Sequence, residues 1–217
     1  MADLAGGKYP QSAAISNLLG SPSNSQVTGQ PIRSNLEWLG VNGLADTAAS
    51  LVTQVMTVVP VPVDSGVSIK NISMLVGATA AGTPTNSWAA LYAGTNTATP
   101  ALIAQTADGT TTAISASARF DFSFTNTNVQ TITPALAPYG YIFVAIMVKA
   151  TTVPSLVTVP NGAAAAQYAW FSNFPGASFA SVPGTLAFSA GSSLTTTAPT
   201  TLTSVAAKTV APAVFLW

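Results

Sequence analysis

From about residue 51 onward, apolar residues recur at every second position in short runs, and turn-forming residues separate the runs. The clearest case is Arg119–Phe124, in which Phe residues alternate with polar residues. A side-chain period of two is typical of a strand that buries one face. The run Tyr141–Lys149 is almost wholly apolar, which predicts a central strand covered on both faces. This part of the chain therefore predicts a β domain.

The remaining strands are predicted from the same pattern. Pro60 and Pro62, near the end of the predicted strand Val55–Val63, favour an edge position there, because proline cannot donate a hydrogen bond to a neighbouring strand. About eight strands with regularly spaced turns predict an antiparallel β-sandwich of jelly-roll type over residues 51–217. The further strands that we predict are Val55–Val63, Val67–Val76, Ser87–Tyr92, Ala101–Thr106, Tyr168–Phe171, Thr185–Phe188, Leu202–Val205 and Val210–Trp217.

Residues 1–50 differ from the rest and predict an extended N-terminal arm with one or two short helices. Gln11–Leu19 has one apolar helical face and ends at Gly20, and Ser34–Glu37 has the spacing of a capping box. Helices this short need a surface to pack on. That surface is either the arm's own domain or a neighbouring subunit, and the sequence leaves both open. The apolar residues expected to make the contact are Ile15, Leu18, Leu19, Leu36, Trp38 and Leu39.

The charge and residue content excludes several function classes. Charged residues make up 6% of the chain, the formal net charge is zero, and the chain contains no Cys and no His. A neutral chain lacks the basic face that nucleic acid requires. Without Cys or His, the common zinc sites and the Ser-His and Cys-His nucleophile systems are excluded. We expect no catalytic residue, no metal and no cofactor, and therefore a non-enzymatic protein.

Two further features bear on location. The first eight residues lack the plan of a secretory signal, which predicts synthesis in the cytoplasm. The longest uninterrupted apolar run, Tyr141–Val148, is too short to span a bilayer as a helix, so we expect no membrane partner.

A small set of residues could contact or cleave a glycan. Aromatic side chains stack on sugar rings when they are exposed, although aromatic residues at strand spacing more often belong to a core. The candidate glycan contacts are Tyr139, Trp170 and Phe174. Cleavage of a glycan would require two carboxylates to meet, and Asp108 with Asp121 is the pair that we consider. The simpler interpretation is that Asp108 is a turn residue and that Asp121 lies on the solvated face of a strand.

Two segments carry a resemblance to a known family. Ile69–Ala93 contains a strand that ends in Gly77, a Thr-Pro-Thr loop, then a Trp and a Leu-Tyr strand, and Tyr139–Pro154 is a Tyr-rich strand that closes on Ala-Thr-Thr-Val-Pro. In this order the segments resemble small Ala/Thr-rich virion proteins of tailed bacteriophages that infect actinobacteria. The resemblance covers roughly residues 51–217.

The resemblance implies a structural or host-facing part of the phage particle. We expect a capsid decoration protein on the virion surface, anchored through its N-terminal arm to the major capsid protein. The alternative is a minor tail or receptor-binding protein that contacts other tail proteins and recognises host surface carbohydrate. Either role suits a homo-oligomer, with a trimer as one option.

Overall fold

The computed structural model describes residues 32–38, 45–47, 51–94, 99–125, 129–160, 187–208 and 210–217. The chain divides into two units, Met1–Ile32 and Arg33–Trp217. Only the second is described below, and it begins ahead of the boundary predicted at Leu51. Its described strands pair antiparallel throughout, and the described residues contain no α-helix. The predicted all-β antiparallel class is confirmed.

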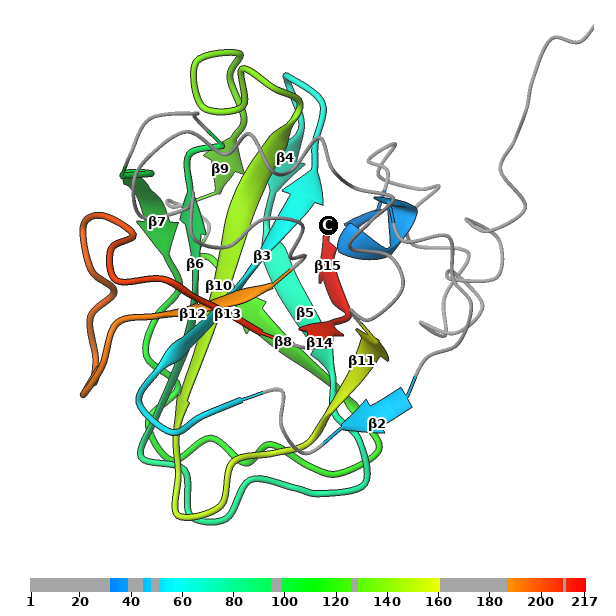
Figure 1. Ribbon diagram of the computed structural model, residues 1–217, viewed down its shortest axis with the longest axis vertical. Helices are drawn as coiled ribbons and strands as arrows, with labels where there is room; N and C mark the ends of the chain where they lie inside the picture. The colour runs from blue at the N-terminus through cyan, green and yellow to red at the C-terminus, as the bar shows by residue number, and fades with distance from the viewer. Residues whose placement is uncertain are drawn as a thin grey trace, which may run out of the picture. The chain divides into compact units, whose positions relative to one another are not determined.

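The largest sheet has six strands and is built around the apolar strand predicted to be central (Figure 1). β10 lies between β3 and β6, and all residues from Tyr141 to Val148 are buried. β6 is buried along its whole length as well. In spatial order the strands are β13 (Ala206–Ala207), β12 (Phe188–Ala190), β3 (Met56–Pro62), β10 (Tyr141–Lys149), β6 (Asn86–Tyr92) and β7 (Leu102–Gln105).

The prolines of β3 lie where one side of the strand has no partner among the described residues. β12 pairs with β3 only from Met56 to Val58. Pro60 and Pro62 pair with β10 on the other side. A residue without an N–H is tolerated at such a position because no ladder bond is lost there. The placement agrees with the edge position that the sequence predicted for this end of the strand.

A four-stranded sheet contains the last strand of the chain in its interior. β15 pairs with β1 on one side and with β5 on the other. Phe122 and Phe124 are buried while Arg119 and Ser123 are exposed, which confirms the alternation predicted for β8. In spatial order the strands are β1 (Arg33–Ser34), β15 (Val214–Leu216), β5 (Asn71–Leu75) and β8 (Arg119–Ser123).

Two small sheets complete the described strands. One has three strands and the other has two, and all pairs are again antiparallel. The three-stranded sheet touches β5 through its central strand. Its strands are β14 (Val210–Pro212), β11 (Leu156–Pro160) and β2 (Ala45–Thr47), and the pair is β4 (Ser68–Ile69) with β9 (Gln130–Thr131).

A β-bulge divides the stretch that the sequence predicts as one strand, Val67–Val76. The backbone N–H groups of Lys70 and Asn71 both donate to the carbonyl of Trp217, at 2.9 and 2.8 Å. Two successive residues therefore oppose one residue, which bends the strand and shifts its side-chain alternation by one position. β4 ends before this point and β5 begins after it.

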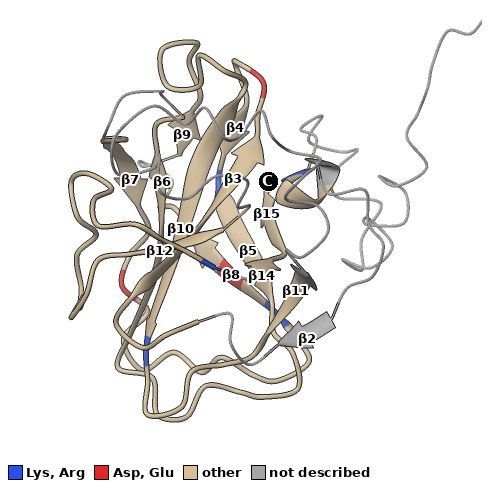
Figure 2. Cartoon of the chain, viewed as in Figure 1, with Lys and Arg blue, Asp and Glu red and all other residues tan. Residues whose placement is uncertain are grey.

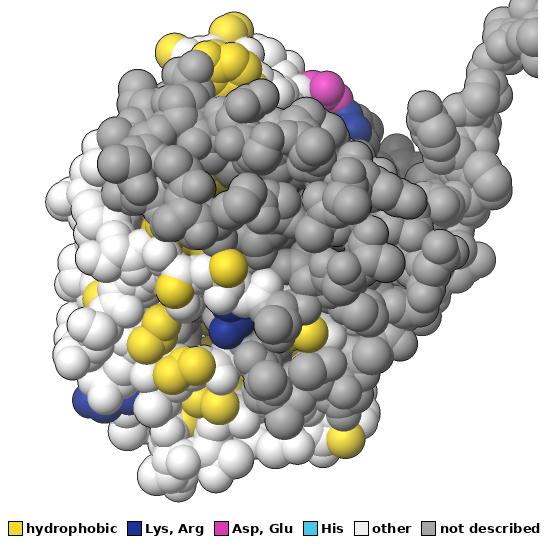
Figure 3. All heavy atoms as spheres, in the orientation of Figure 1, with side chains coloured by type: hydrophobic (Ala, Val, Ile, Leu, Met, Phe, Trp, Pro, Cys, Tyr) yellow, Lys and Arg dark blue, Asp and Glu magenta, His cyan; other side chains and the backbone are white. Residues whose placement is uncertain are grey.

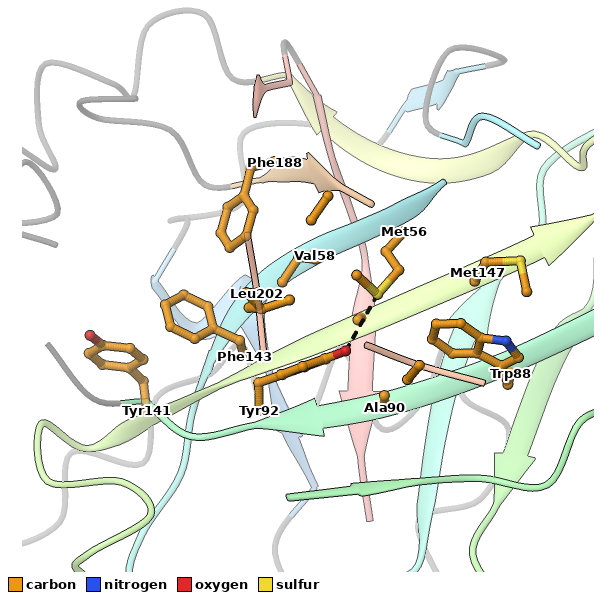
Figure 4. Close-up of a cluster of buried hydrophobic side chains, with 13 residues drawn as sticks. Met56, Val58, Trp88, Ala90, Tyr92, Tyr141, Phe143, Met147, Phe188 and Leu202 are labelled. Atoms are coloured by element: carbon orange, nitrogen blue, oxygen red, sulfur yellow. Dashed lines mark hydrogen bonds between the residues drawn. The ribbon is translucent and has the colours of Figure 1, made fainter. Parts of the chain in front are cut away.

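One face of the six-stranded sheet carries a cluster of large buried side chains (Figure 4). Tyr92 of β6 lies beside Phe143 of β10, and Trp88 lies beside Met147 further along the same two strands. Phe188 of β12 meets Phe143 edge to face with 5.6 Å between ring centroids. Edge-to-face geometry matches the positive rim of one ring to the negative face of the other. The cluster joins four neighbouring strands into one core.

The segment 194–200 lies against β6 and β7 and is held by side chains of those strands (orange to red beside β7 in Figure 1). Trp88 Nε1 donates to the Thr195 carbonyl at 2.7 Å, and the Tyr92 hydroxyl donates to the Pro199 carbonyl at 2.8 Å. Gln105 bonds the segment twice, once as donor and once as acceptor. The polar ends of two core aromatics are thereby satisfied by backbone.

The predicted second helix of the arm is replaced by a short strand and a 3-10 turn. β1 covers Arg33–Ser34, and η1 covers Asn35–Trp38. Ser34 does cap this turn, because its Oγ accepts the N–H of Leu36 at 3.1 Å. Pairing of β1 with β15 fixes the extended backbone at Ser34, which leaves too few residues for an α-helix. The predicted helix at Gln11–Leu19 lies outside the described residues.

Candidate functional site

Tyr139 is the one predicted glycan contact that the structure places, and its side chain is 53% exposed. It sits on a turn just before β10. Gly140, the next residue, has φ of 74°, a conformation that glycine adopts without strain. The Gly140 carbonyl accepts the N–H of Val63 at 3.0 Å, which ties the turn to the end of β3.

The exposed ring of Tyr139 continues into a row of aromatic rings that enters the core. It stacks on Tyr141 at 6.4 Å between centroids and 26° between planes. Tyr141 in turn meets Phe143 edge to face at 5.4 Å (Figure 4). Burial, and secondarily the neighbouring Tyr139, raises the pKa of Tyr141. The turn therefore presents a rigidly backed ring whose other face can stack on a ligand.

The other predicted glycan contacts, Trp170 and Phe174, lie outside the described residues, as does the predicted strand Tyr168–Phe171. The structure thus brings neither of them to Tyr139. The exposed aromatic surface in the described part of the chain consists of Tyr139 and Trp217.

Among the predicted arm contacts, Leu36 is only 1% exposed. The η1 turn that carries it packs on β3 and β15 of its own unit. In this conformation its side chain packs within its own unit. The backbone of Trp38 ends η1, and nothing is described of its side chain. Ile15, Leu18, Leu19 and Leu39 lie outside the described residues.

A second polar and aromatic cluster, which sequence reasoning missed, lies on the four-stranded sheet. Trp217 Nε1 donates to Ser73 Oγ at 2.8 Å, and Ser73 Oγ donates to Asp121 Oδ1 at 2.6 Å. Asp121 Oδ2 also pairs with the Arg119 guanidinium at 3.0 Å. The sequence predicted strands at Arg119–Phe124 and Val210–Trp217. It could not show that β5 would place a serine between them.

Charged side chains are sparse over the described chain (Figure 2). Arg33 forms an ion pair with Asp64, and Arg119 pairs with Asp121. The face drawn in Figure 3 shows the same character, since apolar side chains are scattered among uncharged polar ones with few charges. Contact with a partner on this surface would rest on apolar and neutral hydrogen-bonding groups.

Asp108 is the third carboxylate with described partners. Its Oδ1 accepts the backbone N–H of Ser87 at 2.9 Å. Its Oδ2 accepts from Asn86 Nδ2 at 2.6 Å and from Thr110 Oγ1 at 2.9 Å. Asp108 is bound to the start of β6, whereas Asp121 belongs to β8 of another sheet. The structure does not bring these two acids together in the way that glycan cleavage requires.

No group of three or more His, Cys, Asp or Glu side chains in the described ranges could hold a metal ion. No helix in the part of the chain that the structure describes is long and apolar enough to cross a membrane.

Comparison with known proteins adds no relative. A scan against protein-family models found no matching family, and a search of curated proteins found no match.

Proposed function

We propose that this chain is a non-enzymatic structural protein of a bacteriophage particle, and specifically a capsid decoration protein. In this proposal Arg33–Trp217 forms a β-sandwich of jelly-roll type on the virion surface. Met1–Ile32 anchors it to the major capsid protein, and further copies of the chain complete a homo-oligomer such as a trimer. The chain is synthesised in the host cytoplasm and assembles there.

The observation that carries the proposal is the division of the chain at Arg33. The described start of the second unit belongs to its sheets, because β1 pairs with β15 and Leu36 is buried. Met1–Ile32 is the other unit and contains the apolar Ile15, Leu18 and Leu19. A folded body with a separate apolar segment suits attachment to a larger assembly. Repetition on a symmetric lattice multiplies a weak contact into firm attachment.

The sparse charge of the body supports the same role. The carboxylates of Asp64, Asp108 and Asp121 all bond within the body. Their partners are Arg33, Arg119, Ser73, Asn86, Ser87 and Thr110. Docking of such a body relies on apolar burial rather than on electrostatic attraction. We therefore expect incorporation into particles to be nearly insensitive to salt.

Truncation before β1 tests the anchor. A chain that lacks residues 1–31 keeps β1 and η1, so it should fold with an unchanged far-ultraviolet spectrum but should not enter particles. The matched control is full-length protein with Tyr139→Ala, which should be incorporated normally. Normal incorporation of the truncated chain would refute the anchor.

Immunogold labelling of purified particles, with antibody raised against the Arg33–Trp217 unit, tests the location. Gold over the heads supports the decoration role. Gold confined to the tail refutes it and favours the receptor-binding alternative. Absence of gold from both the heads and the tails of intact particles would refute both roles.

The receptor-binding alternative has its own supporting observation, the exposed Tyr139 ring backed by Tyr141. It predicts that host cell-wall polysaccharide binds saturably to the purified protein. Tyr139→Ala should abolish binding, while Tyr139→Trp should retain it because an aromatic face is kept. Equal binding by the Ala variant and the native protein would remove Tyr139 from the site.

A further inference from the structure

A lysine, an asparagine and an aspartate lie at one end of β6. Lys149 is the last residue of β10 and Asn86 is the first residue of β6, and the two are direct partners across the antiparallel ladder. Side chains of direct partners project from the same face, with Cβ atoms about 5 Å apart. The Lys149 side chain therefore starts next to the Asn86 carboxamide.

Asp108 contacts the nitrogen of that carboxamide. Asn86 Nδ2 donates to Asp108 Oδ2 at 2.6 Å. The Ser87 N–H and the Thr110 hydroxyl, at 2.9 Å each, hold the carboxylate in place. The Asn86 side chain belongs to a residue that is only 8% exposed, so bulk water is largely kept from its carbonyl carbon. A fixed carboxylate at the amide nitrogen is placed to move a proton there.

The Lys149 amine is not committed elsewhere. Within the described ranges its side chain makes no hydrogen bond and no ion pair, Asp108 included, and it is half-buried. Its four-carbon stem is flexible, so a rotamer change can bring Nζ to the neighbouring carboxamide. Holding a nucleophile beside its target replaces an encounter in solution and lowers the barrier.

We propose that Lys149 and Asn86 form an intramolecular isopeptide bond, with Asp108 as the catalytic proton carrier. The neutral amine of Lys149 attacks Cγ of Asn86, the Nζ–Cγ bond forms and the Cγ–Nδ2 bond breaks. Asp108 takes a proton from the attacking nitrogen and delivers it to Nδ2, which leaves as ammonia. The products are one secondary amide and one ammonia, so no oxidant or other reactant is needed.

Such a bond would join two adjacent strands, β10 and β6, of the six-stranded sheet. It would staple the fold of a chain that has no Cys for disulfides, and it would hold in reducing and oxidising surroundings alike. The inference stands apart from the proposed function, because it concerns the chemistry of the folded chain wherever that chain is located.

Mass spectrometry of the full-length protein tests the bond. The expected intact mass is lower than the sequence mass by one ammonia. Trypsin should not cut after Lys149, because an acylated lysine is not recognised. The digest should therefore contain residues 71–119 joined to residues 120–208, whereas the unbonded chain yields three separate peptides, 71–119, 120–149 and 150–208.

Variants separate the bond from other losses of ammonia. Lys149→Arg keeps the charge, but the arginine side chain is not readily acylated. The folded variant should therefore have the full sequence mass. Asp108→Asn keeps the size of the side chain and should lose most of the joined peptide. Native protein of full mass that is cut after Lys149 would overturn the proposal. A mass loss without the joined peptide would also overturn the proposal. Formation of a succinimide at another asparagine causes the same loss of ammonia, and Lys149→Arg would not abolish that loss.

Discussion

The guanidinium of Arg119 lies over the indole of Trp217, with 5.3 Å between Cζ and the ring centroid. The same indole bonds Ser73, which bonds Asp121, which pairs with Arg119. Four side chains thus close a ring of contacts across β5, β8 and the residue that follows β15. Cation–π and charge-assisted contacts of this kind hold the terminal residue against the sheet.

Ser73→Ala should destabilise the protein by about 1–2 kcal/mol, because Trp217 loses its acceptor and Asp121 loses a donor in one change. Ser73 is fully buried, so water cannot fully replace the hydroxyl. Ser123→Ala, at an exposed site of β8, is the matched control and should change the free energy of unfolding by less than about 0.5 kcal/mol. Urea unfolding followed by tryptophan fluorescence measures both. Equal effects would mean that the ring of contacts contributes no stability.

Gly94→Ala should be among the most damaging single changes in the described chain. A Cβ at this position would overlap the carbonyl of Tyr141, at the start of the central strand. We expect a loss of about 3 kcal/mol or more, or failure to fold. Gly140→Ala is the comparison, since a Cβ there meets nothing within 4 Å and only the positive φ of 74° is strained. It should cost about 1 kcal/mol. A Gly94 variant as stable as the Gly140 variant would contradict the overlap.

Tyr92→Phe should loosen the segment 194–200 while leaving the sheet intact. The variant loses the hydroxyl, which donates to the Pro199 carbonyl. The same hydroxyl lies 3.6 Å from Met56 Sδ (Figure 4). The expected loss is about 1–2 kcal/mol of unfolding free energy. Hydrogen exchange should rise in residues 194–200 and not in β10. Tyr139→Phe, at an exposed position, is the control and should change neither the free energy of unfolding nor the hydrogen exchange of residues 194–200.

Stability should fall as the pH rises above 10. Burial raises the pKa of Tyr92 and of Tyr141 well above the ordinary value of 10.0. The folded state then keeps both phenols protonated while the unfolded chain loses those protons. The unfolded state therefore binds fewer protons and is stabilised relative to the folded state as the pH rises. Each tyrosine should remove about 1.4 kcal/mol per pH unit in this range, and nothing below it. Denaturant midpoints at about pH 9 and about pH 11 measure the slope, which Tyr92→Phe should reduce.

The sequence predicts the strands best where side-chain burial alone decides the structure. Tyr141–Lys149, Ser87–Tyr92 and Arg119–Phe124 match β10, β6 and β8 because their patterns reflect covered faces directly. The bulge at Lys70 has no such signal. It depends on a carbonyl of Trp217, far along the chain, that accepts two N–H groups. The prediction of one continuous strand over Val67–Val76 was therefore wrong, because β4 and β5 divide this stretch.

The predicted strand Leu202–Val205 was also wrong, and the reason is local geometry. Ser204 has φ of 53°, which breaks the extended backbone, and the strand β13 begins only at Ala206. Leu202 is buried from a loop rather than from a ladder. An apolar pattern reports burial, and buried residues on loops produce the same pattern as strands.

The candidate site could be predicted only residue by residue. An exposed Tyr139 follows from a turn signal at Gly140, but its stacking on Tyr141 depends on the path of the chain. The grouping of Lys149, Asn86 and Asp108 depends on strand register and on the path of a turn, neither of which a sequence shows. Register places residues far apart in sequence within reach of one another.

The segment 194–200 is recognised through its backbone, and this has a consequence for how the protein can vary. Trp88, Tyr92 and Gln105 bind carbonyl and amide groups that every residue type supplies, apart from the amide that proline lacks. The exposed threonines of the segment, from Thr195 to Thr197, can therefore be exchanged at little cost, whereas the three side chains beneath them cannot. A saturation library should show a tolerant outer layer over an intolerant inner one. New surface chemistry can be introduced there without redesign of the core.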